Sequence, residues 1–327
     1  MQSFLEKISN FSGLSTKDLT SAAHIAPYTY KMYKVKKRKG GERVIFHPSK
    51  QTKTLQYLVT ELLISRLPVH DSAFAYRPGI PSPLRKNAEA HSKNDYLLKL
   101  DFKDFFPSIK PGDFIQIINN AIKLKAVTLP YKITPQDEVF IASALFVKYP
   151  GQNIGLAIGA PSSPSASNAV MLNLDIAFHE IADRYKAVYT RYADDLAFST
   201  PIKGNCSAIF KEVYKTVEEC KSPALAIHPN KIHFLSRRDR RPITGLIVGC
   251  DSTVSIGNKA KYRTRLLLYR FKTKRTNDEE NQYLRGYLAF IRDSDPNFYN
   301  ALIVKYGITL INTLKQGQAM GLGVDSE

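Results

Sequence analysis

The sequence predicts an α+β fold in which helices lie on one side of an antiparallel sheet. Strand-like and helical runs are mixed along the 327 residues, without the regular alternation that is typical of a doubly wound fold. With 43% hydrophobic residues, the chain can bury a sizeable core and form two or three subdomains. Its 47 Lys and Arg against 29 Asp and Glu give a net charge of +18, which indicates a polyanionic partner.

An anionic membrane is the competing partner for so basic a chain. No run approaches the roughly 20 apolar residues of a membrane span, and the N-terminus lacks the pattern of a signal peptide. We therefore expect a soluble, cytoplasmic protein with no membrane partner. Cys206, Cys220 and Cys250 are too few and too scattered for a disulfide framework or a cysteine-based zinc site.

Periodicity and breaking residues predict the order of the elements. Residues 30–49 alternate apolar and basic residues around Gly40 and Gly41, which predicts a basic hairpin. Helices are expected over residues 1–24 (one or two, with Ser15 as a cap), 50–67, 114–122, 135–147, 207–221 and from 259 onward, and a Gly/Pro/Ser loop leads into a long helix that ends near Arg184. Strands are expected over residues 96–102, 189–200 (a hairpin), 225–227 and 243–248.

The segment YTRYADDLAFST (residues 189–200) places two adjacent carboxylates, Asp194 and Asp195, between two strand-like runs. Two aspartates in a tight turn are ordinary turn chemistry, because Asp tolerates unusual backbone angles and hydrogen-bonds its own backbone. The aromatic and aliphatic residues on both sides favour a largely buried hairpin instead. Burial and like-charge repulsion are both costly, and a divalent cation would remove both costs.

A third carboxylate comes at the end of another apolar strand. Asp101 closes the run LLKLD, and if this strand lies beside the hairpin, the three carboxylates converge. Hard oxygen ligands of this kind suit Mg²⁺. Two such ions about 3.5–4 Å apart would hold the attacking and leaving oxygens of a phosphoryl displacement, which is the chemistry of nucleotidyl transfer. Asp104 lies beyond the turn and is expected to be structural.

Three motifs occur in order with helices between them: LKLDFKDFFPSI, GAPSSPSASN and RYADDLAFS. They resemble the successive palm motifs of reverse transcriptases. Residues 87–91 (NAEAH) and 243–248 (ITGLIV) are similar to two further motifs of bacterial retron reverse transcriptases, Asn-Ala-X-X-His and Val-Thr-Gly. The resemblance covers about residues 30–290. It has two departures: Ile158 stands in place of the usual Gln, and Ile243 in place of Val.

The resemblance implies a right-hand polymerase with fingers, a palm built from an antiparallel sheet with helices, and a compact helical thumb. The expected divisions are an N-terminal helical extension at residues 1–29, fingers at 30–95, a palm with interleaved fingers segments at 96–240, and the palm end and thumb at 241–327.

The resemblance also implies roles for single residues. Asp101 and Asp194 would bind the two catalytic Mg²⁺ ions, with Asp195 beside them, and Lys231 would lie near the leaving pyrophosphate. Arg43 would grip the triphosphate of the incoming deoxynucleoside triphosphate (dNTP), a task that suits a bidentate guanidinium.

Two predicted contacts with the substrates have simpler alternatives. Gly159, Ala160 and Pro161 would let the backbone approach a nucleic-acid strand or the incoming base closely, or they form a plain loop and helix cap. Phe106 would pack under the sugar and exclude a 2′-hydroxyl, or it fills the core together with Phe105.

Two retron-type motifs are expected to bind RNA. Asn87 and His91 would contact template RNA or fix a local hydrogen-bond network. Ile243, Thr244 and Gly245 belong to the second of these motifs.

The run at residues 259–275 carries eight basic residues and no acidic one. A helix with one apolar face and one basic face along a duplex backbone fits this pattern, and it would form the thumb. Arg263, Arg265 and Arg270 are the expected phosphate contacts, and the arginines of residues 237–241 would add to the same surface.

The expected function is RNA-directed DNA synthesis. A retron enzyme would copy part of a dedicated structured non-coding RNA into a short DNA primed from a 2′-hydroxyl of that RNA, which leaves an RNA–DNA hybrid. The resemblance also implies defence against phage, with an effector protein as partner. Two alternatives stay open. Another bacterial, group II intron-like reverse transcriptase is disfavoured because no maturase or nuclease extension is recognisable, and an inactive RNA-binding scaffold is disfavoured because all three carboxylates are present.

Overall fold

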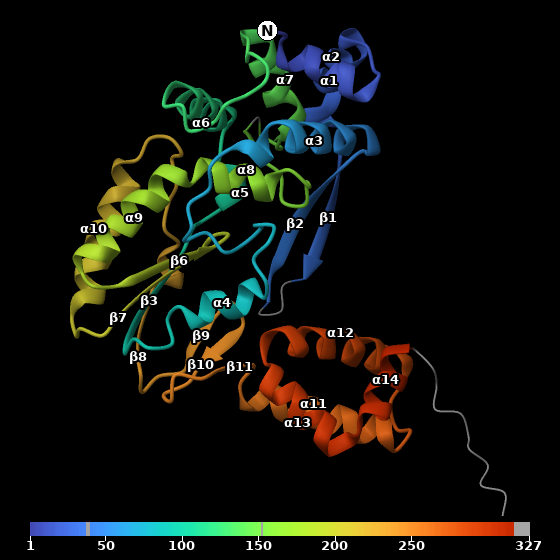
Figure 1. Cartoon of the computed structure of the whole chain (residues 1–327), viewed down its shortest axis with the longest axis vertical. Coiled ribbons are helices and arrows are strands. Elements are labelled where there is room, and N and C mark those ends of the chain that lie inside the picture. The colour runs from blue at the N-terminus through green and yellow to red at the C-terminus, as the bar shows by residue number, and fades with distance from the viewer. Residues whose placement is uncertain (37–39, 152, 317–327) are drawn as a thin grey trace, which may run out of the picture. The chain divides into compact units, whose positions relative to one another are not determined.

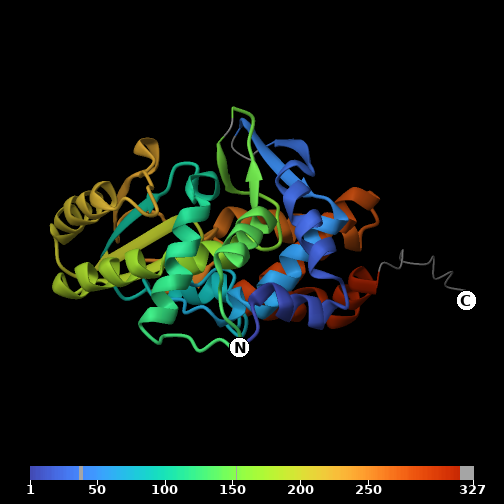
Figure 2. The same ribbon diagram turned by 90° about the horizontal axis from the view of Figure 1, so that it is seen from above.

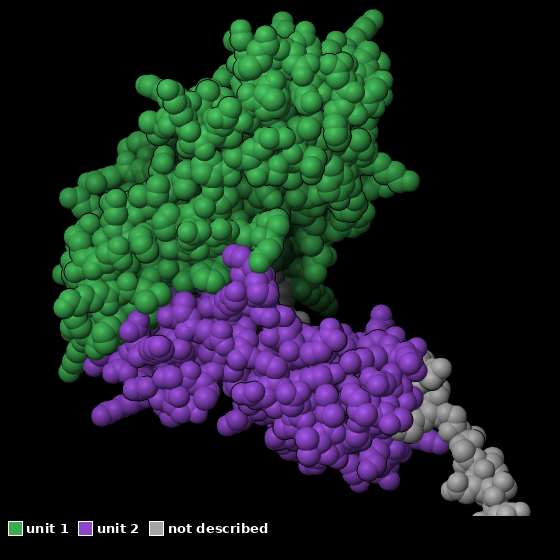
Figure 3. All heavy atoms as spheres, viewed as in Figure 1, with its two compact units in different colours: residues 1–79, 98–234 green, residues 80–97, 235–327 purple. Residues whose placement is uncertain are grey.

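A computed structural model of the chain describes residues 1–36, 40–151 and 153–316. The chain forms two compact units (Figure 3). The first unit comprises residues 1–79 and 98–234, and the second comprises residues 80–97 and 235–327. The segment predicted to form the fingers is thus divided between the two units.

The first unit holds the larger part of the elements. Its helices are α1 (Phe4–Ser12), α2 (Thr16–Ile25), α3 (Lys50–Leu62), α5 (Phe105–Ser108), α6 (Pro111–Lys123), α7 (Pro135–Leu145), α8 (Ser163–Val170), α9 (Leu172–Arg184) and α10 (Asn205–Glu219), with short 3₁₀ turns η1 (Ala26–Tyr28), η2 (Ile64–Arg66) and η3 (Pro229–Lys231). Its strands are β1 (Tyr30–Lys36), β2 (Glu42–Pro48), β4 (Phe146–Lys148), β5 (Ile154–Leu156), β6 (Val188–Tyr192) and β7 (Asp195–Thr200). The chain passes between the units within β3 (Tyr96–Asp101) and β8 (His233–Ser236).

The N-terminal helices form because side chains cap them and because each buries an apolar face. The Ser15 hydroxyl accepts a hydrogen bond from the Asp18 amide at 3.1 Å, so the predicted cap of α2 is confirmed. Buried Asp137 accepts hydrogen bonds from the amides of Phe4 and Leu5, which ties the start of α1 to the start of α7. Helices α1 and α2 therefore pack against α3 and α7 (Figure 1).

The predicted basic hairpin is confirmed, because β1 and β2 pair antiparallel along their whole length. Gly40 and Gly41 at its turn have φ angles of 92° and 81°, a region that favours glycine. A second hairpin, β4 with β5, lies beside the first (Figure 2). No strand is predicted there from the sequence. Each strand of this hairpin has only three residues, too few for an alternating pattern to be visible.

The central sheet has the strand order β6, β7, β3, β8. Strands β6 and β7 form the predicted hairpin, antiparallel from Val188 opposite Ser199 to Tyr192 opposite Asp195. Helices α9 and α10 pack against these two strands (Figure 1). The predicted α+β class is therefore confirmed.

Two predicted elements differ in the structure. The single long helix expected to end near Arg184 is two helices, because α8 ends at Val170 and α9 begins at Leu172. The strand expected over residues 225–227 is wrong, since the segment makes a single bridge, from Ile227 to Phe102.

The second unit combines one small sheet with helices. Its elements are α4 (Pro83–Glu89), β9 (Arg241–Ile243), β10 (Leu246–Val248), β11 (Val254–Ser255), α11 (Asn258–Lys272), α12 (Asp278–Ser294), α13 (Pro296–Tyr306) and α14 (Ile308–Gln316). The predicted strand over residues 243–248 is a hairpin instead, because Thr244 and Gly245 turn the chain with φ angles of 47° and 85°. The predicted basic helix is α11, and its buried residues Leu267, Leu268 and Phe271 form the apolar face.

In residues 1–36, 40–151 and 153–316, no helix is both long enough and apolar enough to cross a membrane.

A buried ion pair lies beneath the β6–β7 hairpin. The Arg191 guanidinium donates two hydrogen bonds to Asp175 of α9, at 2.8 and 2.6 Å, and both side chains are fully buried. The same guanidinium donates to the Asn168 side chain at 3.0 Å and to the Ala193 carbonyl at 3.2 Å. The Tyr189 hydroxyl also donates to Asp175, at 2.7 Å. Because the guanidinium and the carboxylate both have hydrogen-bond partners, the ion pair can remain buried.

Removing the arginine should destabilise the protein strongly. In Arg191→Met, Asp175 is left buried without its cation, a loss of about 3–5 kcal/mol for a broken buried pair. We expect the urea midpoint of unfolding to fall markedly. Arg184→Met is the matched control, because Arg184 forms an exposed pair with Glu212, and solvent screens such a pair so that its loss changes stability little. Equal losses in the two variants would contradict the importance of the buried pair.

Candidate active site

Three carboxylates meet where β3 ends and β7 begins. These strands are neighbours in the sheet, so Asp101, the last residue of β3, lies beside Asp194 and Asp195. The amide of Phe102 donates to the Asp194 carbonyl at 3.1 Å, which joins the two chain segments at this point. The three carboxylates therefore lie close together, as the predicted metal site requires.

Burial and mutual repulsion make these carboxylates hard to ionise together. Burial raises the pKa of Asp194, and the charge of Asp101 raises it further. Burial also raises the pKa of Asp195, against the lowering effect of Lys99. Asp101 and Asp195 are within hydrogen-bonding reach, and the pKa of Asp101 is raised by burial although Lys231 opposes the shift. A cation among them would stabilise the charged forms.

Lys231 already provides one positive charge. Its ammonium donates to Asp101 Oδ1 at 2.5 Å from the short turn η3. Asp101 is nearly buried while the Lys231 side chain is half exposed, so the lysine can swing toward solvent without unfolding the site. The structure thus brings Lys231 to the carboxylates, although 130 residues separate it from Asp101.

The residues fit a divalent metal of the Mg²⁺ type. Among the described residues, no group of three or more carboxylate, histidine or cysteine side chains is already arranged to hold a metal ion. Mg²⁺ does not require one, because it usually takes one or two protein carboxylates and fills its other positions with water and substrate phosphates. Asp101 and Asp194, with Asp195 beside them, would be the ligands.

The turn that carries Asp194 is held in place by the side chain of Arg191. Ala193 has a φ angle of 58°, and its carbonyl accepts the hydrogen bond from Arg191. Asn168, at the end of the GAPSSPSASN motif, accepts from Arg191 and donates to the Ala75 carbonyl at 2.8 Å. Arg191 and Asn168 lie within the motifs RYADDLAFS and GAPSSPSASN, and no role is predicted for either from the sequence. The only sign of a role in the sequence is that each is a polar residue among apolar or small residues.

The Gly-Ala-Pro loop lies against the basic hairpin. A side chain at Gly159 would come within 2.6 Å of Ile45 and 3.2 Å of the Phe46 carbonyl, so β2 itself requires a glycine here. Ala160 is buried beside Phe46. Gly159 remains exposed on its other side and Pro161 is half-buried, so this loop can still face a substrate.

Arg43 is exposed on β2, and its charge reaches the carboxylates, because it lowers the pKa of Asp194. Ile158, the departure from the usual Gln, takes part through its backbone. Its carbonyl accepts the Phe46 amide at 2.8 Å, a contact that any side chain permits.

Phe105 and Phe106 have different environments. Phe105 is buried and stacks on Phe102, with ring centroids 5.7 Å apart. Phe106 is only half-buried and meets Phe105 edge-on at 5.3 Å. Phe105 therefore belongs to the core, whereas part of the Phe106 ring remains exposed.

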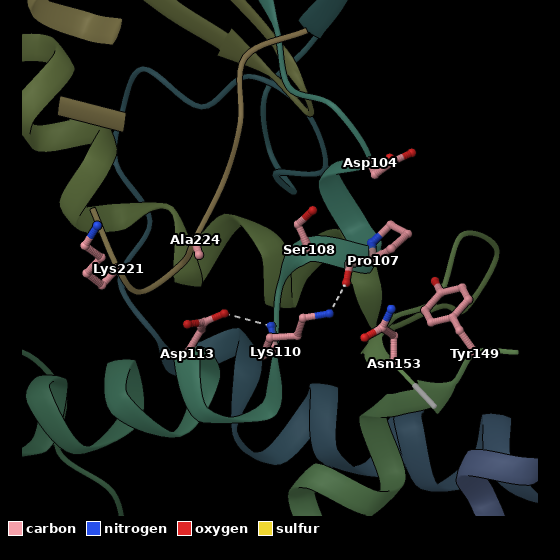
Figure 4. Close-up of a pocket in the computed structure, with 9 residues that line it drawn as sticks. All are labelled: Asp104, Pro107, Ser108, Lys110, Asp113, Tyr149, Asn153, Lys221 and Ala224. Atoms are coloured by element: carbon pink, nitrogen blue, oxygen red, sulfur yellow. Dashed lines mark hydrogen bonds between the residues drawn. The ribbon is translucent and has the colours of Figure 1, made fainter. Parts of the chain in front are cut away.

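A cavity of about 490 Å³ opens on the other residues of α5 (Figure 4). Its lining is Asp104, Pro107, Ser108, Lys110, Asp113, Tyr149, Asn153, Lys221 and Ala224. Two of its charged residues are engaged in the fold, since the Lys110 ammonium donates to the Pro107 carbonyl and the Lys110 amide donates to Asp113. None of the three carboxylates lines it, so this cavity is separate from the candidate active site.

The two retron-type motifs lie together in the second unit. Helix α4 packs on β10, and the Thr244 hydroxyl donates to the Leu84 carbonyl at 3.0 Å. Asn87, His91 and Ile243 are buried. Burial leaves Thr244 and Gly245, at the turn, as the accessible part of the motif.

The basic residues expected on phosphates have partners of their own. Arg263 lies over the Tyr283 ring, Arg265 lies over the Phe298 ring, and Arg270 pairs with Glu280 at 2.6 Å. All three keep part of their surface exposed, so they can still face a backbone.

One arginine of residues 237–241 does not belong to that surface. Arg241 is buried and donates to the carbonyls of Asn94 and Gly249, so its expected contribution to phosphate binding is wrong. It completes the hydrogen bonds of two loops instead.

Comparison with known proteins agrees with this arrangement. The family described as reverse transcriptase (RNA-dependent DNA polymerase) matches residues 35–284. The retron Ec73 reverse transcriptase of Escherichia coli is 33% identical over 299 residues, which cover 90% of this chain and 92% of that protein. The chain belongs to the retron reverse transcriptases. The retron Ec83 reverse transcriptase of Escherichia coli is 31% identical over 88% of this chain and 90% of that protein, and the retron Mx65 reverse transcriptase of Myxococcus xanthus is 30% identical over 82% and 62%.

Among solved structures, apo telomerase from Candida Tropicalis matches with a TM-score of 0.48 and 12% identity. The match covers 89% of this chain and 62% of the telomerase chain. A telomerase from Candida albicans, solved with a fragment of telomeric RNA, has a TM-score of 0.46 and covers 88% of this chain and 61% of its own.

Membership of the retron reverse transcriptases makes the chain an RNA-directed DNA polymerase. As such it uses dNTPs and a divalent metal. The predicted family and enzyme class are confirmed.

A divalent metal should stabilise the folded protein through Asp194. Because burial raises its pKa, Asp194 contributes stability below its ordinary titration range and loses it as the pH rises through the higher, folded-state value. At pH 8 without metal, Asp194→Asn should therefore melt higher than wild type, by a few degrees. Added MgCl₂ should raise the melting temperature of wild type more than that of the variant. Asp71→Asn, at a highly exposed surface carboxylate, is the control. Equal gains in wild type and Asp194→Asn would exclude Asp194 as a ligand.

Proposed function

We propose that this polymerase copies part of a dedicated structured non-coding RNA into a short DNA that starts from a 2′-hydroxyl of the same RNA. The observation that carries the proposal is the juxtaposition of Asp101 with Asp194 and Asp195 on adjacent strands, with Lys231 on Asp101. It supports nucleotidyl transfer in a chain of net charge +18.

In this mechanism Asp101 and Asp194 would hold two Mg²⁺ ions, with Asp195 beside them. The bound ions would lower the pKa of the attacking hydroxyl and neutralise charge on the reacting phosphates. The hydroxyl loses its proton to water, its oxygen forms a bond to the α-phosphorus of the dNTP, the bond from the α-phosphorus to the oxygen that bridges to the β-phosphate breaks, and pyrophosphate leaves. The pair of carboxylates would fix where this exchange occurs, because Asp101 ends β3 and Asp194 directly precedes β7, the neighbouring strand.

Lys231 acts on the leaving group in the same proposal. Its ammonium is half exposed, and it can turn from Asp101 to an oxygen of the departing pyrophosphate and give it a proton. The general acid is thus kept beside the reacting groups before the substrate arrives.

The groups around the carboxylates would hold the incoming nucleotide. Arg43, exposed on β2, would bind the triphosphate as a bidentate donor. The half-buried Phe106 would pack under the sugar, and the loop of Gly159, Ala160 and Pro161 would face the base pair. In the second unit, the contact between α4 and the β9–β10 turn would shape the surface that selects the RNA.

The relatives named as retron reverse transcriptases support a further part of the proposal, which concerns the role of the enzyme in the cell. The enzyme would act in the cytoplasm, carry its RNA–DNA hybrid as a stable complex, and serve defence against phage with an effector protein. The strong positive charge supports tight retention of the nucleic acid.

Opening the contact under the sugar should change which nucleotides are used. In Phe106→Ala, loss of the ring should admit the 2′-hydroxyl, so incorporation of ribonucleotides relative to deoxynucleotides should rise by about tenfold or more. Single-nucleotide extension of a primed RNA measures the ratio. Phe234→Ala, at an exposed ring on β8, is the control and should keep the wild-type ratio. An unchanged ratio in a folded Phe106→Ala would assign Phe106 to packing.

Synthesis should depend on Asp194, and its product should be joined to RNA. With the neighbouring non-coding RNA co-expressed, wild type should purify with a short DNA linked to RNA, which RNase shortens without destroying and DNase reduces to an RNA remnant. Asp194→Asn removes a metal ligand and no phosphate contact, so it should carry the RNA alone and lose primer extension by about 100-fold or more.

Asp71→Asn should behave as wild type. DNA without any RNA linkage, or equal copying of unrelated primed RNAs, would refute the retron-type priming while leaving the polymerase assignment intact. Substantial synthesis by Asp194→Asn would refute the metal site.

A further inference from the structure

A tyrosine with a strained backbone lies beside the turn that carries Asp194. Tyr76 has a φ angle of 58°, a region that a bulky side chain rarely adopts. Its segment runs along β6, because Ala73 forms a parallel bridge with Arg191 and the Phe74 amide donates to the Arg191 carbonyl at 2.9 Å. The two chains run in the same direction from this bridge. Tyr76 and Asp194 are each three residues beyond it, so this register brings the tyrosine to the aspartate.

The same polar side chains hold both turns in place. The Asn168 side chain donates to the Ala75 carbonyl at 2.8 Å, directly before the tyrosine. Asn168 also accepts from Arg191, and Arg191 donates to the Ala193 carbonyl at 3.2 Å. Ala193, directly before Asp194, has a φ angle of 58° as well. Strained conformations persist where the surroundings fix them, and they cluster at functional sites.

The side chain of Tyr76 is accessible and close to charged groups of the candidate active site. It is 44% exposed. Burial raises the pKa of Tyr76, the charge of Asp194 raises it further, and Arg43 lowers it. Arg43 also lowers the pKa of Asp194, so the phenol, the carboxylate and the guanidinium lie near one another. A phenol hydroxyl can both donate and accept a hydrogen bond.

The neighbouring elements offer the nucleotide few polar side chains. Residues 157–161, in the loop before α8, are Ala, Ile, Gly, Ala and Pro, none of which has a hydrogen-bonding side chain. The half-buried Phe106 ring is apolar as well. In the proposed function the metal ions, Arg43 and Lys231 take the phosphates, and the base pairs with the template. The 3′-hydroxyl of the sugar is then the polar group that still requires a partner, because a hydroxyl removed from water without one is costly.

We propose that Tyr76 is a specificity-determining residue that hydrogen-bonds the 3′-hydroxyl of the incoming dNTP. This inference rests on the proposed function, which places the nucleotide between Arg43 and the carboxylates. A site built to bond a substrate hydroxyl rejects the analogue that lacks it, because a polar group of the enzyme is then left unpaired. Tyr76 therefore favours nucleotides from which the DNA can be extended further.

Thymidine triphosphate (dTTP) and its 2′,3′-dideoxy analogue (ddTTP) test the contact, in single-nucleotide extension of a primed RNA whose next template base is adenine. In Tyr76→Phe only the hydroxyl is lost. We expect kcat/KM for dTTP to fall by about 3- to 10-fold, the loss of one hydrogen bond, while kcat/KM for ddTTP does not fall. Tyr57→Phe, at a 60% exposed tyrosine on α3, is the matched control and should keep the wild-type preference for dTTP.

Several results would overturn the inference. An equal fall for both nucleotides would mean that the hydroxyl of Tyr76 only supports the site, and an unchanged preference in Tyr76→Phe would mean that it does not reach the sugar. The same change of preference in Tyr57→Phe would mean that the effect is not local. Wild type provides a measurement that needs no variant, since it should prefer dTTP over ddTTP by about threefold or more, and the absence of any preference refutes the contact.

Equilibrium binding separates this inference from the proposed function. With a primer that ends in a dideoxynucleotide, no bond can form, and wild type should bind dTTP more tightly than ddTTP in MgCl₂. If wild type extends an ordinary primer but Tyr76→Phe keeps the difference in binding, the inference fails and the polymerase stands. If wild type extends no primer but shows a difference that Tyr76→Phe loses, the proposed function fails and the contact with the 3′-hydroxyl stands.

Discussion

The buried pair of Arg191 and Asp175 is the constraint on which the active-site region depends. One guanidinium joins α9, the end of α8 and the carbonyl of Ala193, so a helix pair and a strand turn share a single charge centre. The backbone on either side is tied in as well, because the Arg191 amide donates to Ser72 and its carbonyl accepts from Phe74. A buried ion pair is a poor source of net stability, but it is intolerant of displacement. That intolerance suits a turn whose two aspartates must not move.

Acidic side chains and one lysine lie together next to this turn. Three neighbouring carboxylates have pKa values raised by burial, while Lys231 compensates part of their charge. A bound cation would therefore stabilise the ionised forms of these carboxylates. In the proposed mechanism, the buried pair of Arg191 and Asp175 would set the position of the aspartates, and the carboxylates would set the affinity for metal and nucleotide.

The sequence predicted what local patterns can encode. Asp101 and Asp194 stand at the ends of apolar runs, so strand periodicity located them, and the ordered motifs identified the family. The supporting contacts were out of reach, because periodicity does not say which buried polar groups meet: Asn168 and Arg191 are 23 residues apart, and Thr244 reaches Leu84 across 160. The turn at Thr244 was hidden by its apolar flanks, since a left-handed threonine has no sequence signal of its own. Arg241 counted as a surface charge until its burial was known.

The close approach at Gly159 has a consequence for how this region can diverge. Position 159 and the side chain at position 45 share one small volume, since any β-carbon on the glycine would overlap Ile45. The hairpin and the loop before α8 are thereby a matched surface, and neither can be exchanged alone between relatives. A chimaera that transplants the hairpin from another enzyme would need the partner loop with it, so the two segments form the smallest unit that can be swapped.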